Sequence, residues 1–83
     1  MSDRLVNEIT KGKYNFEART GIAPYYLYLG INQAITLSEY CLDMLRLYGS
    51  SRTLREAFPS EFMGMKTTLV SQENHLSFGL NPL

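Results

Sequence analysis

The sequence predicts one α+β domain over residues 1–83, with a small three-stranded mixed sheet and two main helices on one face of it. The chain has 83 residues, which is enough for a single core. Segments with helical periodicity alternate with short β-rich runs, and no repeat or linker divides them. The expected order is α-β-α-β-β, in two layers, with an extra short helix in the 50–58 segment.

The first helix is expected over residues 2–19. Leu5, Ile9, Gly12 and Phe16 follow one another on a single helical stripe. Gly21 can adopt the left-handed conformation that ends a helix. Gly12 lowers helix propensity, so either another backbone approaches closely there or the helix breaks at that point.

The first strand is expected over residues 25–29. Pro24 excludes a continuing helix and is tolerated where a strand starts. Alternation places the tyrosines Tyr26 and Tyr28 on one face and leucines on the other. Because both faces are apolar or aromatic, we interpret this strand as an interior one.

The second helix is expected over residues 37–47. Thr36 and Glu39 match a capping box, although an earlier start with Asn32 as the cap remains open. The apolar arc of this helix spans nearly ~200°, wider than one sheet would cover. The side chains left without a cover are expected to be among Tyr40, Leu42 and Leu47.

The remaining segments predict a short helix and a hairpin. Thr53 and Glu56 match a second capping box, and Pro59 ends the turns that follow it. Residues 64–71 and 76–80 are expected as strands, with a hairpin turn between them. The long connection from the first strand permits parallel pairing with the second.

This arrangement predicts the side chains on each face of the sheet. The core between sheet and helices should include Leu5, Ile9, Phe16, Leu37, Cys41, Met44 and Leu45. The opposite face should show Tyr26, Tyr28, Lys66, Thr68, Val70 and Ser77. No remaining segment is expected to cover that second face, although residues 50–63 could do so through Leu54, Phe58 and Phe62.

Composition narrows the classes of function. The chain has 45% hydrophobic residues and zero net charge, so it lacks the field that drives non-specific nucleic-acid or membrane binding. No apolar run is long enough for a membrane helix, and the N-terminus does not resemble a signal peptide. A single cysteine excludes an intramolecular disulfide and favours a reducing, cytoplasmic location.

Candidate chemical groups are few. Cys41 and His75 are the only thiol and imidazole, and they lack the further ligands of a zinc site. We expect Cys41 to be buried and unreactive and His75 to be a turn residue, so no catalytic residue, metal or cofactor is predicted. Arg52 and Arg55 flank a helix start and are the candidate anion-binding residues.

Six tyrosines in 83 residues are the strongest anomaly. Tyr26 and Tyr28 could serve a protein interface, simple packing, or base stacking like that of an RNA-binding sheet. We interpret the chain as a non-enzymatic protein that acts through self-association, as a two-fold dimer, or through another protein. The alternative is a weak nucleic-acid or anion-binding accessory protein.

A string of turn and strand residues gives a family resemblance. Residues 19–24, 26–30, 64–70 and 75–78 contain a TG-x-x-P start to a strand, a YLG end and a G-x-K hairpin start. This layout resembles short phage-type and metagenomic proteins of unassigned function. The resemblance implies a virus-associated source and implies no activity.

Overall fold

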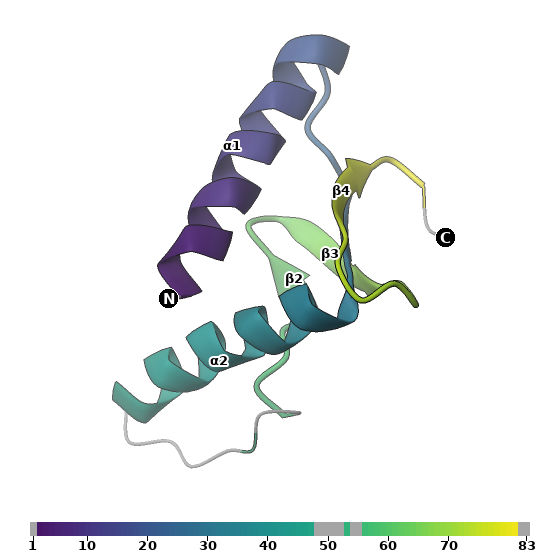
Figure 1. Ribbon diagram of the computed structural model, residues 1–83. Helices are drawn as coiled ribbons and strands as arrows, with labels where there is room; N and C mark the ends of the chain where they lie inside the picture. The colour runs from purple at the N-terminus through teal and green to yellow at the C-terminus, as the bar shows by residue number, and fades with distance from the viewer. Residues whose placement is uncertain (1, 48–52, 54–55, 82–83) are drawn as a thin grey trace.

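The computed structural model describes residues 2–47, 53 and 56–81 and contains two helices and a four-stranded mixed sheet (Figure 1). The elements are α1 (Ser2–Thr20), β1 (Tyr26–Leu29), α2 (Ile31–Leu47), β2 (Glu61–Phe62), β3 (Met65–Leu69) and β4 (Leu76–Gly79). The strand order is β2-β3-β1-β4. The α+β class is confirmed, whereas the expected three strands are four.

Helix α1 ends where the sequence indicates. The φ angle of Gly21 is 74°, and its N–H donates to the Glu17 carbonyl at 2.8 Å. This bond and this conformation satisfy a carbonyl of the last turn and turn the chain away from the helix axis. Leu5 and Ile9 on the predicted stripe are buried.

Gly12 lies in an unbroken helix and against β4. A Cβ built on Gly12 would lie 2.2 Å from Cε1 and 2.5 Å from Cζ of the Phe78 ring. The predicted close contact is confirmed, although its partner is a side chain rather than a backbone. The alternative of a broken helix is wrong, because α1 continues to Thr20.

Replacing Gly12 with alanine is expected to destabilise the protein. The new methyl group would gain about 1 kcal/mol of helix propensity but would displace a packed ring, which costs roughly 1–3 kcal/mol. Thermal unfolding of Gly12→Ala should therefore show a lower Tm. The double variant Gly12→Ala with Phe78→Leu should recover part of the loss, and a raised Tm in the single variant would contradict the contact.

Strand β1 lies inside the sheet between β3 and β4. It pairs in parallel with β3, with Leu29 opposite Leu69, and antiparallel with β4, with Leu29 opposite Leu76. The predicted hairpin between the last two strands is therefore wrong. Their connection instead passes over the carboxyl end of β1, where the chain enters α2.

That connection also fixes the start of α2. The N–H groups of Ile31 and Asn32 donate to the Gln72 and Glu73 carbonyls, each at 2.9 Å. These bonds satisfy amides that a helix N-terminus leaves unpaired. The predicted start at residue 37 is wrong, because α2 begins at Ile31, and the Thr36 hydroxyl donates to the Asn32 carbonyl instead of forming a cap. The alternative of an earlier start is nearer, although Asn32 lies within the helix and does not cap it.

A hairpin does occur earlier in the chain. β2 pairs antiparallel with β3, with Phe62 opposite Met65. The turn residues Met63 and Gly64 have φ angles of 52° and 79°, the two positive values that a type I′ turn requires. β2 was not predicted from the sequence, because two residues give too short a pattern.

The second capping box is confirmed. Thr53 N–H donates to Glu56 Oε1 at 3.0 Å, and Glu56 N–H donates to Thr53 Oγ1 at 3.3 Å. Ala57 N–H then donates to the Thr53 carbonyl at 3.1 Å. Of the short helix expected over 50–58, residues 50–52, 54 and 55 lie outside the described residues, and residues 56–58 form a turn rather than a helix.

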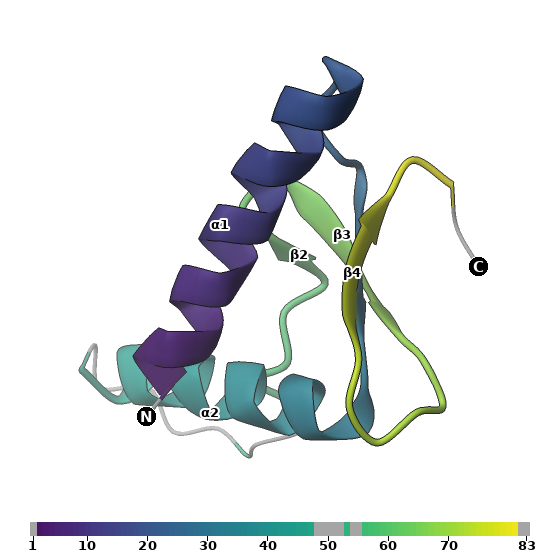
Figure 2. The same cartoon turned by 45° about the horizontal axis from the view of Figure 1, so that its top comes forward.

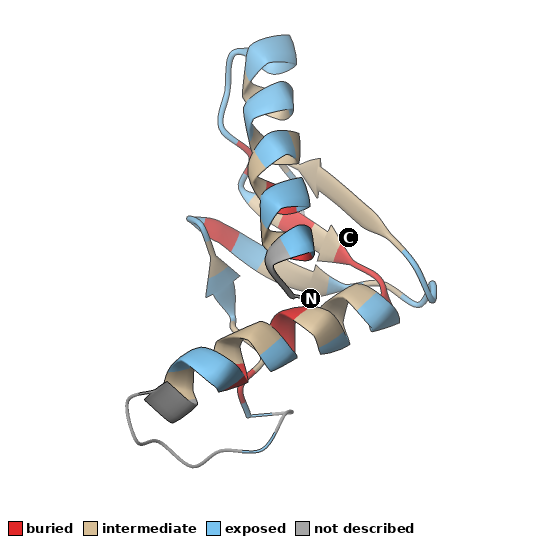
Figure 3. Ribbon diagram, turned by 60° about the vertical axis from the view of Figure 1, so that its left-hand side comes forward, coloured by how far each residue is buried: buried red, intermediate tan, exposed pale blue. Residues whose placement is uncertain are grey.

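The core lies between the leucine face of β1 and the two helices, as the red bands in Figure 3 show. Its buried members are Leu5, Ile9, Leu27, Leu29, Leu37 and Met65. Figure 2 shows α1 and α2 on the same side of the strands. Met44 is exposed rather than buried, because the end of α2 extends beyond the sheet (Figure 1).

Candidate interaction surface

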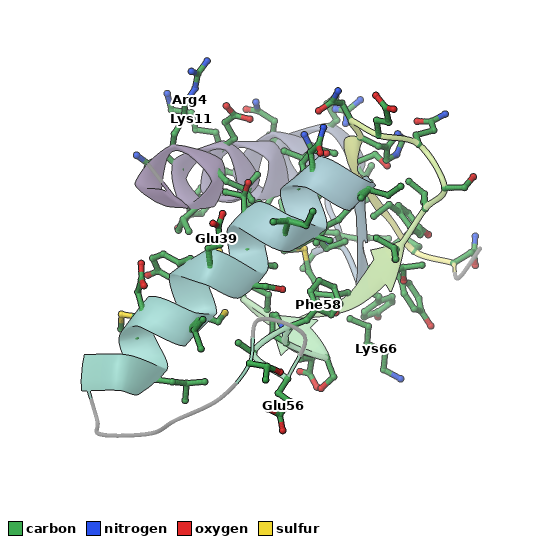
Figure 4. The ribbon with its side chains drawn as sticks, turned by 60° about the horizontal axis from the view of Figure 1, so that its bottom comes forward. Arg4, Lys11, Glu39, Glu56, Phe58 and Lys66 are labelled. Atoms are coloured by element: carbon green, nitrogen blue, oxygen red, sulfur yellow. The ribbon has the colours of Figure 1, made fainter. Side chains whose placement is uncertain are left out.

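The sheet face opposite the helices carries the tyrosines of β1. The Tyr26 and Tyr28 rings are nearly parallel, with 10° between their planes and 6.3 Å between their centroids. Lys66 is the β3 partner of Tyr26, so both side chains belong to the same face. In Figure 4, Lys66 extends from the strands away from both helices. We call the surface of Tyr26, Tyr28, Lys66 and Thr68 the open face.

Tyr28 is less free than the sequence suggests. Its hydroxyl donates to the Asn81 carbonyl, and its ring lies against Gly79, where a Cβ would be 2.8 Å from Tyr28 Cε2. The expectation that no segment reaches this face is therefore wrong at the side of β4. Tyr26 and Tyr28 are both half-buried.

Three hydrogen-bonded side chains, those of Gln72, His75 and Ser77, line a hollow beside Tyr28 on the open face. His75 Nε2 is 2.6 Å from Ser77 Oγ, and His75 Nδ1 is 2.8 Å from Gln72 Oε1. Gln72 Oε1 can only accept a hydrogen bond, whereas the Ser77 hydroxyl can donate or accept, so both groups can pair with the histidine ring.

This order of serine, histidine and acceptor is that of a hydrolase, but a hydrolase also needs free donors for an oxyanion. The backbone N–H of His75 is itself occupied, because it donates to Gln33 Oε1 at 2.9 Å. These hydrogen bonds connect the 72–75 loop to Ser77 of β4 and to Gln33 of α2. The polar residues at 72, 75 and 77 follow no pattern that would predict these hydrogen bonds from the sequence.

The wide apolar arc of α2 is largely covered within the chain. Leu42 is only 8% exposed, so the expectation that it lacks a cover is wrong. Tyr40 makes an edge-to-face contact with Phe62, with 6.4 Å between ring centroids, and Phe58 packs against the core (Figure 4). The Leu47 side chain lies outside the described part of the chain.

The structure does not bring Cys41 and His75 together. Cys41 lies on α2 and packs, half-buried, against the core on the helix side of the sheet. His75 bonds to Ser77 on the open face. Burial raises the pKa of the Cys41 thiol, which keeps it protonated at neutral pH. The predicted full burial is thus only partial.

Two further surfaces were not predicted from the sequence: a pair of exposed isoleucines on α2 and a groove between α1 and β4. Ile31 and Ile35 are exposed one turn apart at the start of α2, which only the earlier helix start reveals. A groove between α1 and β4 is lined by Asn15, Phe16 and Arg19 on the helix side. The groove forms because β4 lies at the edge of the sheet, next to α1.

Other candidate sites have no structural support. Arg52 and Arg55 lie outside the described residues, so the predicted anion site is not placed. Within the described ranges there is no group of three or more potential metal ligands, and no helix is long and apolar enough to span a bilayer. No protein-family model matches the chain, and comparisons with curated proteins and with solved structures give no significant match.

Proposed function

We propose that this protein is a non-enzymatic association module that forms a two-fold dimer through its open face. The observation that carries the proposal is the parallel pair β1–β3, which has helices on only one of its faces in the described part of the chain. Parallel strands are usually covered on both faces. A second sheet packed against the open face supplies the missing layer.

The chemistry of the open face favours a protein partner. Tyrosines combine apolar rings with polar tips and are enriched in protein interfaces. The zero net charge means that two copies meet without overall electrostatic repulsion. A two-fold dimer is the commonest closed assembly and needs no second gene product.

Sedimentation or light scattering over a concentration series tests the proposal. We expect the mass of a dimer at micromolar concentration, and a monomer for Tyr26→Glu, because the carboxylate would be buried in the interface. Tyr14→Glu is the matched control, since Tyr14 is exposed on α1 away from the sheet, and it should remain dimeric. A monomeric parent protein, or a Tyr26→Glu variant of unchanged mass, would refute the proposed dimer.

A weak nucleic-acid-binding function is the second candidate. The stacked Tyr26 and Tyr28 rings beside Lys66 resemble a base-stacking platform. One lysine on this face and zero net charge give little counterion release, so this candidate ranks below association. Sub-micromolar binding of a single-stranded RNA oligonucleotide, lost in Tyr26→Ala, would reverse the ranking.

A further inference from the structure

We propose that the groove between α1 and the free edge of β4 binds an extended acidic segment of a partner protein, which adds a fifth strand to the sheet. This site is distinct from the open face, because it uses the edge of the sheet and the helix side of β4. It therefore does not depend on the proposed dimer.

The two edges of the sheet differ in how they are protected. β2 has only two residues, and one of them is the exposed Glu61. Short length and charge are the usual protection of an edge strand against pairing with another chain. β4 reads Leu-Ser-Phe-Gly, without charge or proline, and it pairs only with β1 among the described strands.

The hydrogen bonds of β4 identify the groups that face outward. Gly30 N–H donates to the His75 carbonyl, and Tyr25 N–H donates to the Gly79 carbonyl. Residues of an antiparallel strand alternate between the two sides, so Ser77 also faces β1. The N–H and C=O groups of Leu76 and Phe78 therefore point away from the sheet, ready to pair with an added strand.

The groove beside this edge can hold side chains of such a strand. It has a volume of about 620 Å³, and its apolar lining comes from Phe16 of α1 and from Leu76 and Phe78 of β4. Strand addition gives affinity through main-chain hydrogen bonds, and pockets for alternate side chains give specificity. Every second side chain of the bound segment would point toward α1 and enter the groove, and those that lie over Phe16, Leu76 and Phe78 should be apolar.

The charges along α1 specify an acidic partner. Arg19 lines the groove, and no acidic residue does. Lys11 lies one helical turn before Asn15 on the same flank of α1, and Figure 4 shows it projecting beside Arg4. Arg4 is paired with Glu8 at 3.4 Å, whereas within the described residues neither Lys11 nor Arg19 makes an ion pair.

The same charges disfavour a second copy at this edge. Two-fold pairing of β4 with β4 would bring the α1 helices of both copies close together. Lys11 and Arg19 of one copy would then face the same cations of the other. Like charges in close apposition oppose association, whereas an acidic segment neutralises them.

The test uses the full chain and a short synthetic peptide of repeating Glu-Thr-Val-Thr, in which glutamate and valine alternate along the side that faces α1, followed by amide hydrogen exchange in NMR. We expect saturable binding that slows exchange at Leu76 and Phe78 by roughly tenfold or more, because these amides become hydrogen-bonded. The Ser77 amide, already paired with β1, should change little. A peptide of repeating Lys-Thr-Val-Thr, which presents lysine to α1 instead of glutamate, should not bind.

Charge reversal and backbone methylation complete the test. The double variant Lys11→Glu with Arg19→Glu should bind the glutamate peptide with an affinity at least about tenfold lower. The same variant should gain affinity for the lysine peptide. Lys66→Glu, on the opposite face, should bind as the parent does. A glutamate peptide N-methylated at alternate positions should lose binding, because it cannot donate to the edge.

The proposal fails if the glutamate peptide does not bind, if it binds without protecting Leu76 and Phe78, or if the methylated peptide binds equally. It also fails if protection of these amides rises with protein concentration in the absence of peptide, since a second copy would then occupy the edge. Loss of the dimer in Tyr26→Glu should leave peptide binding unchanged, which separates this site from the open face.

Discussion

Replacing Gly30 with alanine is expected to lower the free energy of unfolding by about 3 kcal/mol. A Cβ on Gly30 would lie 2.6 Å from the His75 nitrogen and 2.9 Å from the Asn74 carbonyl carbon. Both are backbone atoms, so the 72–75 loop as a whole must move away. That movement would weaken the bonds from Ile31 and Asn32 to the loop and release the start of α2.

Denaturant unfolding and circular dichroism measure this effect, and a loss of 3 kcal/mol corresponds to a Tm lower by about 12–24 °C in a domain of this size. Gly64→Ala is the matched control. Its Cβ meets open space, so its cost of about 1 kcal/mol comes only from the φ angle of 79°. Equal losses in the two variants would show that the loop does not constrain Gly30.

Replacing Leu27 with alanine should cost about 2–5 kcal/mol, because the variant leaves a cavity at the centre of the core. Leu27 is 0% exposed and belongs to the inner strand between β3 and β4. A domain of this size has only about 4–12 kcal/mol of total stability. The substitution therefore removes a large fraction of the total stability, and we expect the midpoint of denaturant unfolding to fall accordingly.

Leu69→Ala provides the internal control for this measurement. Leu69 is the same residue type in the same sheet but is 58% exposed, so its loss should change the unfolding free energy by less than about 1 kcal/mol. Chemical denaturation of both variants at one temperature gives the comparison. A similar loss at both positions would contradict the assignment of the core to the helix side of β1.

Local chemistry made several elements predictable. The stripe of Leu5 and Ile9 and the stop at Gly21 define α1 without reference to any other segment. The alternation in residues 26–29 separates leucines from tyrosines because strand side chains point to opposite faces in turn. The box of Thr53 and Glu56 forms as expected, because both partners lie within one turn.

The candidate surfaces were only partly predictable. Tyr26 and Tyr28 belong to the face opposite the core, as the alternation indicates. Tyr40 was expected to lack a cover because Phe62, which meets its ring edge to face, lies far away in the sequence. The groove at β4 could not be anticipated, since the predicted hairpin gave that strand a different neighbour.

The sequence by itself determined the apolar stripe and the end of α1, the extended conformation of residues 26–29, and which side of β1 is apolar. Those properties depend on residue spacing and on backbone preferences that act over a few residues. The tertiary structure decided the strand order and the start of α2. Both depend on the position of the 72–75 loop. The carbonyls of Gln72 and Glu73 can accept from Ile31 and Asn32 because β1 lies between β3 and β4. Such long-range hydrogen bonds leave no periodic signal in the chain, so spacing alone could not reveal them.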